Sequence, residues 1–135
     1  MRSTSPLMTV IVTAFMLLEA NSALARTQTV YNVIDKPIHT LSGDRLGLSM
    51  VEEILRNAAT TKRWVVSRKG DGHLQAEIHV RKHFAAIDIT FDETTYSIKY
   101  RDSKVLRYDG EEIHRNYNKW TKLIEKLADT SFEAR

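Results

Sequence analysis

The sequence contains no cysteine among its 135 residues. This absence excludes disulfide bonds, thiolate catalysis, cysteine-ligated zinc, iron–sulfur clusters and lipid attachment at an N-terminal cysteine. Long blocks of like charge, internal repeats and low-complexity segments are also missing, and the net charge is only +3 at pH 7. We predict no nucleic-acid partner, because proteins that bind nucleic acids usually cluster Lys, Arg and stacking aromatics on one stripe.

The apolar run from Leu7 to Leu18 is too short for a transmembrane helix. It covers about 12 residues, whereas a hydrocarbon core of ~30 Å needs about 20. Arg2 precedes the run, and Ala23-Leu24-Ala25 follows it with the small-x-small pattern that a signal peptidase cleaves. We therefore predict a signal peptide at 1–25 and cleavage between Ala25 and Arg26. The product would be periplasmic or secreted, without a stable membrane span after processing; the alternative is an uncleaved anchor.

Removal of 25 of the 135 residues leaves 110, which is the size of one domain. A chain of this length buries enough surface for one hydrophobic core without disulfide bonds. The removed segment contains one arginine and one glutamate, so the net charge stays at +3.

Alternation of apolar and polar residues dominates residues 64–101. A period of two predicts antiparallel strands with one apolar and one solvated face. We expect turns at 70–72, 82–84 and 92–95, and a short edge strand at 30–34 ahead of Pro37. The predicted inward-facing residues are Leu74, Ala76, Ile78, Val80, Ala85, Ile87, Ile89, Phe91, Tyr96, Ile98 and Tyr100.

Two amphipathic helices are predicted on either side of this region. The first begins at Ser49, which has the spacing of a capping box with Glu52. Its buried stripe is Val51, Ile54, Leu55 and Ala58. The second begins at Asp109, where an acidic first turn suits the helix dipole. Its stripe is Ile113, Tyr117, Trp120, Ile124 and Leu127.

These elements predict a two-layer α+β fold. Its sheet is an antiparallel meander of three to five strands, and both helices pack on the apolar face. The predicted organisation is an extended leader and edge strand at 26–48, one compact α+β domain at 49–128 and a fraying tail at 129–135.

No catalytic, cofactor-binding or metal-binding site is predicted. The five histidines form no H-E-x-x-H or His-x-His pattern. His73 and His79 share a strand face but lie about 20 Å apart at ~3.4 Å per residue. No Gly-x-Ser-x-Gly elbow is present, and the acidic pairs at 92–93 and 111–112 are explained by a turn and a helix start. We therefore expect a protein that is not an enzyme.

The solvated face of the meander is one candidate partner surface. With the predicted turns, His79, Asp88 and Lys99 face one another across three strands, and Arg81 and Arg101 flank a single alanine. Cross-strand charge pairs of this kind contribute ~0.2–1 kcal/mol each. Two interpretations stay open: a solvated face with tolerated charges, or a basic patch that docks an acidic partner or a cell-wall polymer.

The start of the second helix is the other candidate surface. His114, Arg115, Asn116 and Asn118 surround its first turns, where helix propensity favours other residues. We expect the asparagines to bond neighbouring loops at 102–103 or 108–109, and a partner-binding role is the alternative.

Four segments resemble a family of small exported proteins and lipoproteins of Gram-negative bacteria with no established activity: 63–64, 72–76, 96–103 and 113–120. The resemblance covers roughly 49–127, and it implies an envelope location and one compact domain but no catalytic residue. Many members carry a cysteine at the processing site. This chain has Ala25-Arg26 there, so the resemblance does not imply a lipid anchor.

Our leading hypothesis is an exported, non-enzymatic domain that binds or supports an envelope protein or an anionic cell-wall component. The second hypothesis is a small-ligand binder with a pocket lined by Trp64, Tyr100, Tyr117 and Trp120, and the third is a small envelope enzyme. An apolar cavity of at least ~300 Å³ would favour the pocket. A filled interior with an exposed patch would favour the partner surface.

Overall fold

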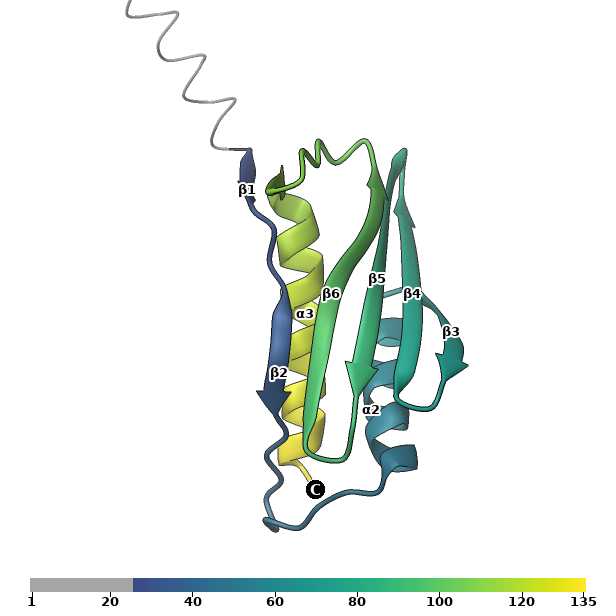
Figure 1. The fold of residues 1–135 in the computed structure, drawn as a ribbon, viewed down its shortest axis with the longest axis vertical. Helices are drawn as coiled ribbons and strands as arrows, with labels where there is room; N and C mark the ends of the chain where they lie inside the picture. The colour runs from purple at the N-terminus through teal and green to yellow at the C-terminus, as the bar shows by residue number, and fades with distance from the viewer. Residues whose placement is uncertain (1–25) are drawn as a thin grey trace, which may run out of the picture.

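Figure 1 shows the computed structural model, which describes residues 26–135. The predicted signal peptide at 1–25 lies outside the described residues. In chain order the elements are β1 (Thr27–Thr29), β2 (Val33–Pro37), α2 (Leu48–Thr61), β3 (Val65–Gly70), β4 (His73–Val80), β5 (His83–Phe91), β6 (Thr95–Lys104), β7 (Glu112–His114) and α3 (Arg115–Glu133).

The main sheet has five antiparallel strands in the order β2-β6-β5-β4-β3. The strands β3 to β6 form the predicted meander, and β2 adds an edge strand beside β6. A separate two-stranded sheet pairs β1 with β7. Both helices lie against one face of the main sheet, behind it in the view of Figure 1. The predicted two-layer α+β class is confirmed.

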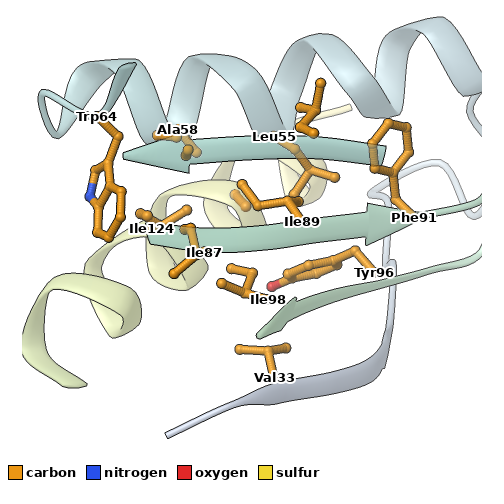
Figure 2. Close-up of a cluster of buried hydrophobic side chains, with 14 of the residues drawn as sticks. Val33, Leu55, Ala58, Trp64, Ile87, Ile89, Phe91, Tyr96, Ile98 and Ile124 are labelled. Carbon is orange, nitrogen blue, oxygen red and sulfur yellow. The ribbon is translucent and has the colours of Figure 1, made fainter. Parts of the chain in front are cut away.

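The core lies between the helices and the inner face of the sheet, the face that points toward the helices. The alternation of apolar and polar residues in the strands produces this core, because every second side chain of a strand points to the same face. Figure 2 shows side chains from both layers meeting there. The helices α2 and α3, the strands β2, β5 and β6, and the residue just before β3 contribute Val33, Leu55, Ala58, Trp64, Ile87, Ile89, Phe91, Tyr96, Ile98 and Ile124. Val80 was expected to point inward, but it is 36% exposed at the end of β4.

Both ends of the second helix differ from the prediction. Asp109 does not begin the helix: its carboxylate accepts the backbone N–H groups of Glu111 and Glu112 in a turn. Residues 112–114 form β7 instead of a first helical turn, because β1 supplies backbone partners for them. The helix begins at Arg115, and the His114 ring accepts the backbone N–H of Asn116 as its N-cap.

The predicted tail at 129–135 is also wrong for most of its length. Helix α3 continues to Glu133, and Phe132 is only 1% exposed. Its ring lies 5.8 Å from that of Tyr96 on β6, between centroids. The pattern missed this turn because Phe132 is a single apolar residue in a polar stretch, and only the adjacent strand buries it.

The first helix begins near the predicted position but without the predicted cap. It starts at Leu48, and its N-cap residue Gly47 makes no side-chain hydrogen bond. The predicted stripe is buried as expected: Val51, Ile54, Leu55 and Ala58. Packing of this face against the sheet, rather than a capping box at Ser49, therefore stabilises the helix.

Candidate functional site

The strand register on the outer face of the sheet, the face that points to solvent, differs from the prediction. Asp88 does lie opposite Lys99, but its neighbour on β4 is Gln75, and His79 lies opposite Phe84. The reason is a tighter turn between β4 and β5. Val80 already pairs with His83, so two residues make the whole turn. The pairing slips by an even number of residues, which keeps every side chain on its predicted face.

The Asp88 carboxylate lies between a histidine and an arginine on this face. One carboxylate oxygen lies 2.7 Å from His73 Nε2, and the other lies 3.5 Å from Arg101 Nη1. Burial opposes ionisation, yet hydrogen bonds from His73 and Gln75 and the charge of Arg101 hold the pKa of the Asp88 carboxyl below its usual value. The Arg101 charge is therefore matched within the protein.

The two arginines do not flank an alanine as predicted. Ala86 lies between Glu77 and Asp102, so carboxylates occupy the positions beside it. Arg81 is exposed in the turn after β4, with a left-handed φ of 57°. The outer face thus mixes both signs of charge.

Asn118 is a structural residue. It is 3% exposed. Its side-chain oxygen accepts the backbone N–H of Tyr31 at 2.9 Å, and its nitrogen donates to the Thr29 carbonyl at 2.9 Å and to Gln28 Oε1 at 3.2 Å. The expected bonding role is confirmed, but the partners are in the N-terminal segment and not in the loops at 102–103 or 108–109.

A basic groove runs along the outer side of α3. Its volume is about 510 Å³, and its lining residues, which define the α3 groove, are Gln28, Arg115, Asn116, Asn118, Lys119, Lys122, Leu123 and Lys126. Arg115 and Asn116 were predicted as candidates for a partner surface, and the groove contains both. The three lysines were missed. Their signal was present, because positions 115, 119, 122 and 126 have the i, i+4, i+7, i+11 spacing of one helix face.

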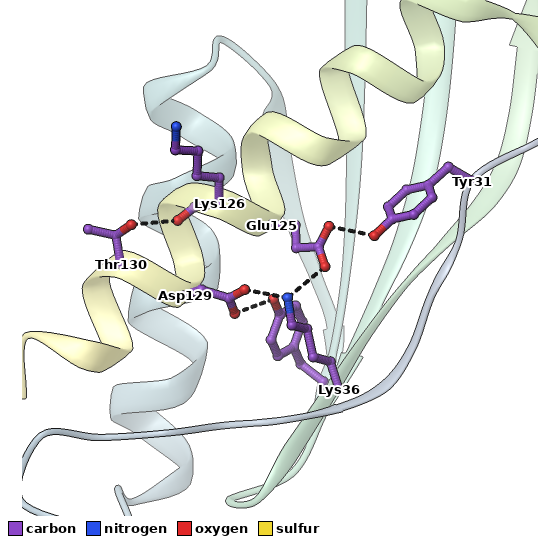
Figure 3. Close-up of polar contacts among 7 residues, drawn as sticks. Tyr31, Lys36, Glu125, Lys126, Asp129 and Thr130 are labelled. Carbon is purple, nitrogen blue, oxygen red and sulfur yellow. Dashed lines mark hydrogen bonds and ion pairs between the residues drawn. The ribbon is translucent and has the colours of Figure 1, made fainter.

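The carboxylates nearest to these lysines in sequence are held by a different cation. Glu125 and Asp129 have helical spacings that would suit ion pairs with Lys122 and Lys126. Instead, Lys36 Nζ lies 2.8 Å from Glu125 Oε2 and 2.5 Å from Asp129 Oδ2. Figure 3 shows both carboxylates turned toward Lys36, whereas the Lys126 ammonium points away from them.

Two tyrosines complete this network on the side of α3 that faces β2. The Tyr31 hydroxyl donates to Glu125 at 2.7 Å, and the Tyr96 hydroxyl donates to Asp129 at 2.6 Å. The hydrogen bond to Glu125, together with burial, raises the pKa of Tyr31 to about 12. Burial disfavours the charged form of Lys36, but the two carboxylates outweigh it and raise the pKa of the lysine. The network therefore ties both carboxylates to the Lys36 ammonium and the two tyrosine hydroxyls rather than to the lysines of α3.

The four groove cations consequently face solvent without a carboxylate partner. Within residues 26–135, no ion pair involves Arg115, Lys119, Lys122 or Lys126. Lys122 does have a contact, since its ammonium lies 4.9 Å from the centre of the Tyr31 ring. Unlike the outer face of the sheet, the α3 groove presents one sign of charge.

More positive charge lies at the N-terminal end of α3. The His114 ring lies 6.4 Å from the His83 ring, between centroids. Burial, then the positive charges of His83, Arg115, Arg107 and Arg26, lower the pKa of His114. The end of the groove at Arg115 therefore continues into a basic neighbourhood.

The aromatic residues of the predicted ligand pocket belong to the core. Trp64 and Tyr117 are buried, and Tyr100 and Trp120 pack against the same cluster while half-exposed. The Tyr100 and Tyr117 rings meet edge to face at 5.6 Å between centroids. These four aromatic side chains therefore help to fill the interior of the domain.

Between positions 26 and 135, no three His, Asp or Glu side chains lie close enough to hold a metal ion. Neither of the two described helices has the length and apolar character needed to cross a membrane. The ring of His79, a residue of the candidate partner surface on the sheet, lies 4.9 Å from the Phe84 ring, between centroids.

Comparison with known proteins returned no match to any family model, curated protein or solved structure. Function must therefore be inferred from the surface of the molecule itself.

Proposed function

We propose that this protein is an exported, non-enzymatic domain that binds an anionic component of the cell envelope through the α3 groove. The observation that carries the proposal is the row of four cations, Arg115, Lys119, Lys122 and Lys126, without a carboxylate partner among the described residues. Surface cations are normally interspersed with anions, and an uninterrupted row attracts an anionic partner.

Export is supported by the sequence alone. The apolar run and Ala23-Leu24-Ala25 fit a cleaved signal peptide, and the resemblance to small exported proteins of Gram-negative bacteria implies the envelope as location. Cell fractionation followed by N-terminal sequencing tests this part. Arg26 at the N-terminus of soluble periplasmic protein supports export, and Met1 on membrane-bound protein contradicts it.

The binding part is tested with a triple variant of the groove, Lys119→Gln, Lys122→Gln and Lys126→Gln. Each cation on an anionic surface contributes about 1 kcal/mol, so the three changes should weaken binding about 100-fold at low salt. The measurement is retention on immobilised heparin over a salt gradient, and wild-type retention should fall with salt because exposed charges are screened.

The matched control removes three exposed lysines elsewhere, Lys69→Gln, Lys82→Gln and Lys99→Gln. It changes the net charge by the same amount, and Lys99 belongs to the outer face of the sheet. The control should stay near wild type. Equal losses in both variants would mean that net charge, and not the groove, governs binding.

A further inference from the structure

The α3 groove contains more than its cations. Gln28 and Asn116 place carboxamides beside the basic row, and Leu123 adds an apolar surface. Gln28 Oε1 accepts a hydrogen bond from Asn118, which fixes the amide so that its nitrogen is left to donate. Within residues 26–135, neither the Gln28 amide nitrogen nor the Asn116 side chain has a hydrogen-bond partner. The site therefore offers neutral hydrogen-bonding groups together with positive charge.

The cations are arranged lengthwise. Arg115 and Lys126 are eleven positions apart, so at 1.5 Å per residue the row extends about 16 Å along α3. The N-terminal segment carrying Gln28 lines the groove along with the helix. An elongated recess between two chain segments fits an extended anionic chain better than a single small anion.

A bilayer surface fits this recess poorly. Membrane-bound helices insert an apolar face among the lipids, but the apolar face of α3 is packed in the core through Tyr117, Ile124, Ala128 and Phe132. The large hydrophobic side chains that the described chain exposes all lie outside the groove: Ile34, Leu41, Val65, Val80, Val105 and Tyr108. No apolar anchor therefore accompanies the lysines.

A protein or nucleic-acid partner also lacks its usual anchors. Protein interfaces depend on buried aromatic and Arg anchors, and single-stranded nucleic acids stack their bases on aromatic rings. The groove lining includes no Trp, Tyr or Phe, its single arginine, Arg115, is exposed rather than buried, and the Tyr31 ring is covered by the Lys122 ammonium at 4.9 Å. Carboxamides both donate and accept hydrogen bonds, so they suit the hydroxyl groups that a polysaccharide supplies along its length.

We infer that the α3 groove binds a linear acidic polysaccharide, with Lys119, Lys122, Lys126 and Arg115 pairing its anionic groups and Gln28 and Asn116 bonding its hydroxyls. The inference rests on the proposed function and names the chemical class of its ligand. The polymer lies parallel to α3, and its end near Arg115 approaches the basic neighbourhood of Arg107 and His114.

The experiment measures the affinity of the purified chain for four probes at one ionic strength by calorimetry. Alginate is a linear carboxylated polysaccharide, and dextran is its neutral counterpart. Poly-L-glutamate supplies an acidic polypeptide, and phosphatidylglycerol vesicles supply an anionic membrane. We expect alginate to bind at least tenfold more tightly than polyglutamate or the vesicles, and dextran not to bind.

Two variants separate charge from hydroxyl recognition. The lysine triple variant should lose alginate and every other anionic probe. The double variant Gln28→Ala, Asn116→Ala should weaken alginate about fivefold or more and leave polyglutamate unchanged, since it removes no charge. Thermal unfolding of both variants verifies that they remain folded.

The outcomes distinguish the two proposals. If polyglutamate or vesicles bind through the same lysines as tightly as alginate, or if the amide variant binds alginate like wild type, the polysaccharide inference is overturned and the anionic groove stands. If the lysine variant stays folded and binds every probe like wild type, both are overturned.

Discussion

The Lys36 ammonium of β2 lies 2.8 Å from a carboxylate oxygen of Glu125 on α3, a residue 89 positions later in the chain. Asp129 shares the same ammonium at 2.5 Å. This contact removes two carboxylates from the reach of the lysines on the same helix. The charge of the α3 groove therefore depends on a residue that does not line it.

Replacement of Lys36 by Met should weaken binding of anions in the groove. Without Lys36, Glu125 and Asp129 become free to pair with Lys122 and Lys126 at helical spacings. We expect Lys36→Met to elute from immobilised heparin at clearly lower salt than wild type. Lys69→Met, an exposed change with the same loss of charge, is the matched control, and identical elution of the two variants would argue against the mechanism. Because the side chain of Lys36 is 37% exposed, the cost to stability should stay near or below about 1 kcal/mol.

Asn118→Ala should destabilise the protein. The change leaves the Tyr31 N–H and the Thr29 carbonyl without their side-chain partner, and an unsatisfied buried polar group costs about 1–3 kcal/mol. Urea unfolding measures the difference in the free energy of unfolding. Asn116→Ala, an exposed change two positions earlier, should stay within about 0.5 kcal/mol of wild type. Equal effects of the two changes would show that Asn118 does not hold the N-terminal segment.

Phe132→Ala should be among the more damaging single changes, although it lies three positions before Arg135. A fully buried phenylalanine replaced by alanine typically costs about 3–5 kcal/mol, and Phe132 is 1% exposed. Chemical unfolding of the variant measures the loss. The exposed neighbour Glu133→Ala should change stability by less than about 0.5 kcal/mol. A frayed C-terminus would make both variants neutral.

His114 should make stability depend on pH in the acid range. Burial and nearby cations lower its pKa in the folded protein below the ordinary value near 6.5. The unfolded chain therefore binds the proton first, so the stabilisation is fully present above about pH 6.5 and is lost as the pH falls toward the folded pKa. Protonation also removes the acceptor that caps α3, because both ring nitrogens of the charged imidazole carry hydrogens and Nδ1 no longer accepts from Asn116.

The matched variant for this prediction is His114→Asn, because asparagine also accepts hydrogen bonds at an N-cap. Unfolding free energies of both proteins should be compared from pH 5 to pH 7.5. Wild type should lose more stability than the variant on acidification. An NMR titration of the His114 ring with a midpoint above 6.5 would contradict the argument.

Two periodicities in the sequence are enough to predict the layers of this fold. A period of two requires strands with one apolar face, and a period of 3.6 requires helices with one apolar stripe, so the inner side chains of β5 and the stripe of α2 could be read directly. The basic row at 115, 119, 122 and 126 was equally readable, because helical spacing places these positions on one face.

The strand register, the ends of α3 and the charge pairing on the surfaces depend on contacts between segments that are distant in the sequence. A four-residue difference in the pairing of His79 and Asp88 leaves the alternation unchanged, so the pattern cannot detect it. Phe132 is buried by a strand distant in sequence. Glu125 pairs with Lys36 of β2 and not with a lysine of its own helix. The reason is that charge pairing depends on distance in space and not on position along the chain.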